Sequence, residues 1–146
     1  MPAQLTNFLA AIDGSEGGWR ALNVAIAMTK AAAGSLVVMT VGVALTSREV
    51  AEFRRAEGGE ADASEVFAER LLFEARKRAD QAIGKPTKTL LRWDDPAEAI
   101  INTIAEERFD AVVVGRRGRG QLSGLLLGSV SQKLASLAPC IVVVVP

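Results

Sequence analysis

Residues 111–129 read AVVVGRRGRGQLSGLLLGS, in which an apolar run leads into a glycine-rich loop and then into a helix-patterned segment. Glycine tolerates backbone conformations that other residues avoid, and it lets the chain come close to a ligand. Three glycines are spaced through the stretch so that a serine stands where the next helix begins: Gly115, Gly118, Gly128 and then Ser129. The stretch predicts a phosphate-binding loop that follows a buried strand.

The start of the following helix supplies the hydrogen-bond donors that such a loop needs. The first N–H groups of a helix have no partner within it, and they lie at the positive end of the helix dipole. We therefore expect Ser129, Val130 and Ser131 to offer N–H groups to phosphate oxygens. Three arginines add positive charge, and we expect at most one of them to contact phosphate: Arg116, Arg117 and Arg119.

Outward from this loop, apolar runs rich in β-formers alternate with helical periodicity. The predicted strands lie at residues 8–12, 36–43, 88–93, 111–114 and 141–145. Helical patterns separate them at residues 21–32, 64–83, 96–104 and 130–137, the third with Asp95 as its cap and Pro96 at its first position. Uninterrupted apolar strands joined through helices indicate a parallel sheet covered by helices on both faces, so the predicted fold class is α/β.

Residues 46–63 depart from this alternation. The segment is polar, its centre is dense in charge, and it contains the pair Gly58-Gly59. We expect a mobile loop there.

Composition limits the function classes. The chain has 146 residues, 49% of them hydrophobic, which suits one domain over residues 1–146. Its 17 basic residues balance 17 acidic ones, so no global field favours nonspecific binding to nucleic acid or a membrane.

Histidine is absent and Cys140 is the one cysteine, which excludes an internal disulfide and histidine triads and argues against structural zinc. Without a secretory pattern or a membrane-length apolar run, we expect a cytoplasmic protein.

In sheets of this class, ligands bind beyond the carboxyl ends of the strands, where the strand order reverses. The turn after residues 8–12, which contains Asp13, is therefore expected to meet the loop after residues 111–114. The first strand is not followed by G-x-G-x-x-G, and no P-loop pattern ending in Gly-Lys-Ser/Thr is present. A dinucleotide site of the Rossmann type and a P-loop site are both disfavoured.

The pattern that remains, Gly115-x2-Gly118-x9-Gly128-Ser129, resembles the glycine motif of the universal stress protein family. Further matches follow in the family's order and span nearly the whole chain: AIDGS at 11–15, DPAE at 95–98 and APC at 138–140. The resemblance implies an open five-stranded parallel sheet, Rossmann-like and similar to the adenine nucleotide alpha-hydrolase fold. It also implies membership of the family's ATP-binding branch.

Carried over by position, the resemblance implies an ATP site, with or without Mg²⁺. Asp13 would lie near the ribose and phosphates, and Val41 would contact adenine through its backbone. Ala11 stands where some nucleotide-binding members have proline, a position that supplies backbone shape. The phosphate cradle would consist of five residues, with backbone amides and one serine hydroxyl as donors: Gly115, Gly118, Gly128, Ser129 and Val130.

Two positions depart from the family pattern. Arg116 stands where a small residue is common, and Asp94 stands where the family often has glycine. The resemblance also implies a homodimer joined through the last strand, residues 141–145, and an exposed apolar edge strand would invite such pairing on physical grounds.

Simpler interpretations of these residues stay open. Asp followed by Gly and Ser is typical of a strand-to-helix turn, so Asp13 is also expected to serve as a turn or cap residue. Val41 would fit in a core, and the arginines of the loop would keep a glycine-rich segment soluble.

The leading functional hypothesis is a stress-response protein that binds ATP, turns it over slowly or not at all, and acts as a nucleotide-dependent switch or binding module toward an unspecified protein partner. Phosphoryl transfer needs positioned charge and a base or an oriented water, and the sequence shows no pair of carboxylates to hold a metal. The alternatives are an ATP-hydrolysing or nucleotidyl-transferring enzyme that uses Asp13 and a loop arginine, and a dimeric interaction protein without nucleotide. A relative of electron-transfer flavoproteins shares the general architecture, although this chain is short for that class.

Overall fold

The computed structural model describes residues 4–42, 47–57, 63–118 and 127–146. Within these ranges the strands are β1 Asn7–Ala11, β2 Ser35–Gly42, β3 Lys88–Trp93, β4 Ala111–Gly115 and β5 Ile141–Val145. The helices are α1 Glu16–Ala32, α2 Ser47–Glu57, α3 Ala63–Ile83, α4 Pro96–Glu107 and α5 Ser129–Leu137. Among them, none combines the length and the apolar character needed to cross a bilayer.

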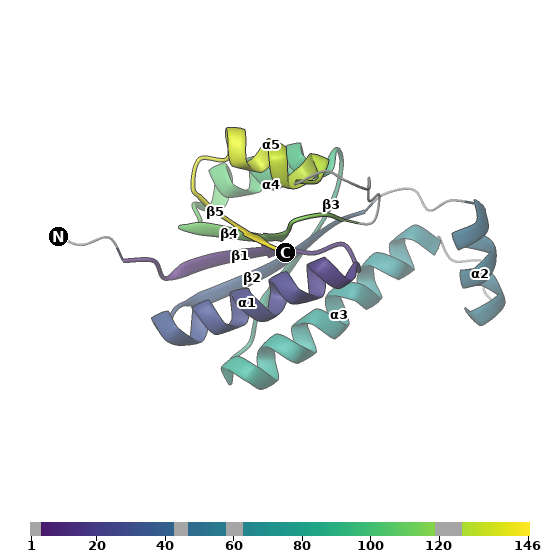
Figure 1. Ribbon diagram of the computed structural model, residues 1–146. Helices are drawn as coiled ribbons and strands as arrows, with labels where there is room; N and C mark the ends of the chain where they lie inside the picture. The colour runs from purple at the N-terminus through teal and green to yellow at the C-terminus, as the bar shows by residue number, and fades with distance from the viewer. Residues whose placement is uncertain (1–3, 43–46, 58–62, 119–126) are drawn as a thin grey trace.

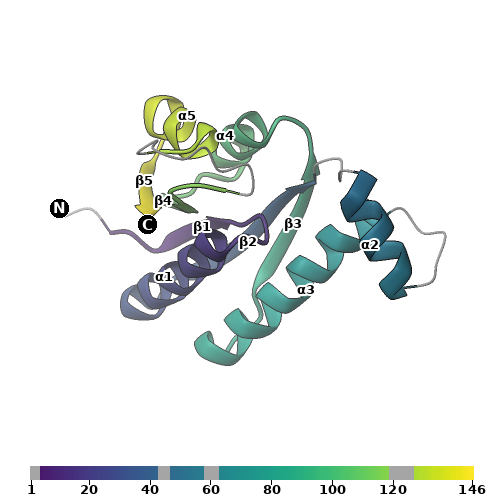
Figure 2. The ribbon, with the colours of Figure 1, turned by 45° about the vertical axis from the view of Figure 1, so that its right-hand side comes forward.

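The strands form one parallel sheet in the order β3-β2-β1-β4-β5. Its centre is β1, which pairs with β2 on one side and β4 on the other, for example Leu9 with Val37 and with Val112. Helices α1 and α3 cover one face, and α4 and α5 cover the opposite face (Figures 1 and 2). The predicted α/β class, the parallel sheet and the helices on both faces are confirmed, and β5 lies at an edge.

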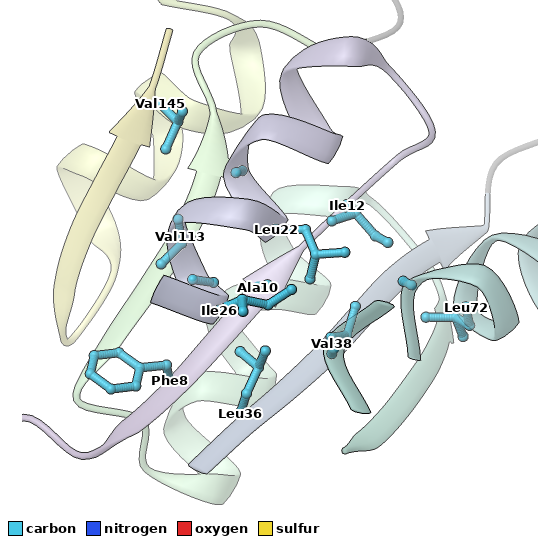
Figure 3. Packing of buried hydrophobic residues seen from close by; sticks show 14 of the residues in the cluster. Phe8, Ala10, Ile12, Leu22, Ile26, Leu36, Val38, Leu72, Val113 and Val145 are labelled. Atoms are coloured by element: carbon cyan, nitrogen blue, oxygen red, sulfur yellow. The ribbon is translucent and has the colours of Figure 1, made fainter. Parts of the chain in front are cut away.

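Side chains alternate between the two faces of the sheet, so each central strand contributes to two cores. Phe8 and Ala10 belong to the cluster under α1 and α3, which Figure 3 shows with Leu22, Val38 and Leu72. Leu9, between Phe8 and Ala10 in sequence, belongs to the cluster under α4 and α5. Because both faces are buried, these strands read as uninterrupted apolar runs.

Side-chain caps fix where two of the helices begin. The Ser15 hydroxyl accepts a hydrogen bond from the Gly18 N–H at 3.1 Å and so caps α1. The Asp95 carboxylate accepts from the Glu98 N–H at 3.1 Å, with Pro96 in the first turn of α4. The predicted start of α4 is therefore confirmed.

The expectation of a loop over residues 46–63 was wrong for its central part. Residues Ser47–Glu57 form α2, which lies against the start of α3 (Figure 1). An exposed ion pair one turn apart, Arg48 Nε to Glu52 Oε1 at 3.2 Å, supports this helix. The segment is dense in charge and poor in apolar residues, and this composition made it read as a loop. The pair Gly58-Gly59 lies outside the described residues.

Asp110 ties the amino ends of three strands together, at the opposite end of the sheet from the glycine loop. Its carboxylate accepts backbone hydrogen bonds from Thr6 at 3.0 Å and Asn7 at 2.8 Å, and its carbonyl accepts from the Ile141 N–H at 3.3 Å. The hydrogen bonds from Thr6 and then Asn7 lower the pKa of the Asp110 carboxyl below its ordinary value.

This pKa shift predicts a pH-dependent contribution to stability. A carboxyl whose pKa is lowered by folding stabilises the folded state above its ordinary pKa of 3.8 and loses that contribution as the pH falls through the lowered value. Asp110→Asn should therefore lower the melting temperature at pH 7, and its difference from the native chain should shrink as the pH falls below about 3.8. Thermal denaturation at several pH values measures this, with Glu106→Gln on exposed α4 surface as the charge-matched control. A constant difference across the pH range would contradict the assignment.

Candidate functional site

The reversal of strand order creates a crevice at the carboxyl ends of β1 and β4. These strands are neighbours, yet the chain leaves β1 for α1 on one face and leaves β4 for α5 on the other. Crevices of this kind are where open α/β sheets bind ligands. The predicted meeting of the Asp13 turn with the glycine loop is confirmed, because Asp13 and Gly118 both line one cavity there.

The cavity has a volume of about 400 Å³ and is walled by the ends of β1, β2 and β4 and the first turns of α3, α4 and α5. Every residue that the sequence predicted for the site lines it: Ala11, Asp13, Val41, Gly115, Arg116, Gly118, Gly128, Ser129, Val130 and Ser131. Arg117 lies in the wall as well, whereas Arg119 falls outside the described residues.

The Asp13 carboxylate is held by the turn that it starts. Its Oδ1 accepts hydrogen bonds from the backbone N–H and the hydroxyl of Ser15, and Ser15 in turn caps α1. The turn interpretation of Asp13 is thus confirmed, although Ser15 is the capping residue itself. The same turn fixes the Asp13 carboxylate in the cavity wall.

Gly118 allows the two loops to approach each other closely. A Cβ added at Gly118 would lie 2.5 Å from Oδ2 of Asp13, a distance that real Cβ atoms do not reach. Gly115 does the same against α1, because its added Cβ would lie 2.8 Å from the carbonyl carbon of Gly17. Close packing against backbone therefore requires glycine at Gly115, and glycine at Gly118 lets the Asp13 carboxylate come close.

The two described ends of the glycine loop are joined at the Arg116 carbonyl. This oxygen accepts the Gly128 N–H at 2.7 Å and the Ser131 hydroxyl at 2.7 Å. The Arg116 N–H donates to the Val145 carbonyl at 2.7 Å, which anchors the same residue to β5. The start of α5 is thus fixed in position relative to the ends of β4 and β5.

The amino end of α5 lies in the cavity wall and carries N–H groups that have no partner within the helix. Its N-cap is Gly128, which provides no side-chain hydrogen bond, and the helical ladder begins with Gln132 N–H donating to the Gly128 carbonyl at 3.0 Å. The N–H groups of Ser129–Ser131 therefore have no partner within the helix. They lie at the positive end of the α5 dipole, which favours an anion.

Among the described residues that line the cavity, the charged side chains are one carboxylate and two guanidinium groups, Asp13, Arg116 and Arg117. The Nε atom of Arg116 is buried and has no hydrogen-bond partner in the described structure. No group of three or more acidic or cysteine side chains suited to a metal occurs within the described ranges. The wall therefore combines helix-end amides with excess positive charge, a donor set that suits a phosphorylated ligand.

Sequence reasoning missed the contribution of two helices to the wall. The first turns of α3 and α4 add Ser64, Phe67, Ala68, Pro96 and Ile100. Helical spacing identified Phe67 and Ile100 as buried-face residues but could not tell a core neighbour from an open cavity. The order of the elements could have indicated this contribution, since both helices begin near the edge of the sheet where the cavity lies.

The remaining aromatic and sulfur residues behave mostly as expected. Trp19 packs beside the core, with the Arg78 guanidinium carbon 4.2 Å from its ring centroid. Trp93 was expected to be a packing residue, yet it is 50% exposed while its ring covers Gly42. Cys140 packs against the second core, and burial raises the pKa of its thiol.

Comparison with known proteins agrees with the fold. Universal stress protein YxiE of Bacillus subtilis (strain 168) is 29% identical over 147 residues, which cover 94% of this chain and 96% of that one. A putative universal stress protein of Staphylococcus aureus (strain USA300) is 30% identical over 140 residues, covering 95% and 82%.

Solved structures give the same result in three dimensions. Universal stress protein UspA from Lactobacillus plantarum superposes with a TM-score of 0.80 at 19% identity, covering 99% of this chain and 100% of that one. A universal stress protein in complex with cAMP has a TM-score of 0.72 at 25% identity, with 99% of each chain covered. A universal stress protein from Archaeoglobus fulgidus in complex with dAMP has a TM-score of 0.71 at 17% identity, with coverage of 99% and 100%.

The model of the universal stress protein family matches residues 5–146, which is nearly the whole chain. With the five-stranded parallel sheet and the curated relatives in agreement, the chain belongs to the universal stress protein family.

Proposed function

We propose that this chain binds an adenine nucleotide, with ATP as the ligand, and acts as a nucleotide-dependent switch or binding module in the response to stress. The observation that carries the proposal is the meeting of the uncapped start of α5 with Arg116 in one cavity at the reversal of strand order. A phosphorylated ligand would pair both the free helix amides and the guanidinium charge.

The adenine part of the proposal is supported by two family members whose structures are described as complexes with cAMP and dAMP. In this chain the base would lie toward β1 and β2, against Ala11 and the backbone of Val41. The phosphates would lie toward Gly118, Gly128 and the first turn of α5. A cavity of about 400 Å³ lies within the range typical of small-molecule sites.

Slow turnover, or none, follows from what the wall offers to a reaction. The sequence contains no histidine, and Asp13 is the one carboxylate among the described lining residues. Its Oδ1 already accepts two hydrogen bonds from Ser15, which weakens it as a general base. When Mg²⁺ accompanies the nucleotide it would neutralise phosphate charge, and Asp13 is the residue that would face it.

The direct test is to denature the purified protein, identify any released nucleotide by chromatography, and titrate the nucleotide-free protein with ATP and Mg²⁺ by calorimetry while following product. Stoichiometric binding with turnover far slower than dissociation supports the proposal. Rapid release of phosphate, pyrophosphate or AMP would favour an enzyme instead. Absence of binding would favour a dimeric interaction protein.

Gly128→Ala tests the proposed phosphate cradle. The added Cβ would lie 3.2 Å from the Arg116 carbonyl oxygen and 3.2 Å from the Arg117 Cα, so the loop must shift where phosphate would approach. We expect ATP affinity to fall about tenfold or more, the loss of roughly one good hydrogen bond, while the protein stays folded.

The control is Gly84→Ala, at the end of α3 and outside the cavity wall, where φ is +83°. It should lower the melting temperature because alanine is strained at this φ, and it should leave ATP affinity unchanged. Equal ATP affinity in Gly128→Ala and the native chain would remove the loop from the site.

We also propose a homodimer in which the β5 edges of two copies pair. Ile141 directs its N–H toward β4, so by the alternation of strands Val142 and Val144 direct theirs toward the open edge. The side chains along this edge are apolar and partly exposed, with Ile141 48% exposed. Such an edge pairs readily with a second chain.

Val142→Pro should convert the dimer to a monomer, because proline removes an outward N–H without touching the ladder to β4. Light scattering after size-exclusion chromatography measures the mass, with Val142→Thr as the control that keeps the N–H. A native chain that is monomeric at about 100 μM, the upper end of the concentrations used for such measurements, would contradict the proposed dimer, as would a proline variant of unchanged mass.

A further inference from the structure

Arg116 carries a buried polar group that the fold leaves without a partner. Its Nε atom is buried, and no described residue accepts a hydrogen bond from it. The side chain also forms no ion pair with any residue in the described ranges, although Arg116 lines a cavity that contains the Asp13 carboxylate. Leaving a charged donor buried and unpaired is unfavourable unless a ligand supplies the acceptor.

The backbone of Arg116 cannot serve a ligand, because its polar atoms are already paired. The N–H donates to Val145, and the carbonyl accepts from both Gly128 and Ser131, each at 2.7 Å. Of the polar groups of Arg116, only the side chain is left to interact with a ligand. These hydrogen bonds also fix the Arg116 main chain to β5 and α5, so the side chain starts from a position set before any ligand arrives.

The neighbouring Arg117 does not share this environment. It lines the same cavity and carries the same charge, but none of its side-chain nitrogens is buried without a partner. Its carbonyl oxygen faces Gly17, where an added Cβ would approach to 3.0 Å. The two arginines are therefore neighbours of equal charge and similar residue burial, and they differ in that Arg116 alone has a side-chain nitrogen buried without a described partner.

Two separate donor groups thus belong to residues of the cavity wall, on different elements. One is the set of amides at the start of α5 that have no partner within the helix, which suits a single phosphate group. The other is the Arg116 guanidinium at the end of β4, whose planar fork suits phosphate oxygens and whose charge persists at all physiological pH values. A ligand with one phosphate can satisfy the first group alone, whereas a longer phosphate chain can satisfy both.

We propose that Arg116 makes this site selective for nucleoside polyphosphates over nucleoside monophosphates, by binding phosphate beyond the group held at the amino end of α5. This inference rests on the proposed function, because it assigns the specificity of the same cavity. The negative charge of Asp13 in the same wall strengthens the need for Arg116, since that charge would repel each added phosphate.

The test compares dissociation constants for adenosine, AMP, ADP and ATP, measured by calorimetry without metal on the nucleotide-free native chain, Arg116→Gln and Arg117→Gln. In the native chain, affinity should rise along the series. Arg116→Gln should lower ATP affinity about 10- to 100-fold, as expected for a lost hydrogen bond to a charged group, and should change adenosine affinity less than about twofold. Arg117→Gln removes the same charge and should change the ratio of ATP to AMP affinity less than about threefold, because no side-chain nitrogen of Arg117 is buried without a partner that a phosphate would have to supply.

Each outcome bears on a distinct claim. Suppose that the native chain binds every ligand and that Arg116→Gln has the same ratio of ATP to AMP affinity as the native chain. This result overturns the role of Arg116 and leaves the proposed nucleotide site intact. A native chain that binds neither adenosine nor ATP overturns the proposed function and this inference together. If circular dichroism shows that Arg116→Gln does not fold, Arg116→Met replaces it in the test, because methionine keeps the apolar stem of the side chain. Equal affinities of the native chain for AMP and ATP would overturn the inference without any variant.

Discussion

The parallel pairing of β1 with β4 is the constraint on which the rest of the structure depends. The two strands are far apart in sequence, yet Leu9 pairs with Val112 at the centre of the sheet. Because their following helices depart to opposite faces, nothing in the sheet itself fills the space beyond their carboxyl ends. The Asp13 turn and the glycine loop meet there, and glycine at Gly118 is what lets them meet so closely. The cavity thus results from the strand order and the close approach of the two loops.

The Arg116 carbonyl fixes the position of the start of α5 in the cavity wall. By accepting from Gly128 and Ser131, it brings the start of α5 against the end of β4. The Ser131 hydroxyl donates to the Arg116 carbonyl, so the group of Ser131 that remains for a ligand is its backbone amide. Amides fixed in this way need no rearrangement to meet an anion, which favours binding.

Much of this was predictable from particular residues. Apolar runs such as residues 111–114 indicated strands buried on both faces, and Asp95-Pro96 marked the start of α4 because capping chemistry is local. The helix at Ser47–Glu57 was missed because its charge-dense, weakly apolar composition resembles that of a loop, and its contact with α3 joins segments that composition does not connect. Phe67 and Ile100 were assigned to buried faces, but whether a buried face meets core or cavity depends on contacts between distant segments. The unpaired Nε of Arg116 likewise follows from burial, and sequence offers no signal for it.

The central claim is that the unpaired amides at the start of α5 hold the phosphates of a nucleotide. The most direct measurement is a ¹⁵N-resolved NMR titration of the nucleotide-free protein with ATP. The account predicts the largest amide shifts at Ser129, Val130 and Ser131, and a much smaller shift of the indole N–H of Trp19, which packs beside the core and is not among the residues that line the cavity. Saturable ATP binding that leaves the three α5 amides unshifted would contradict it.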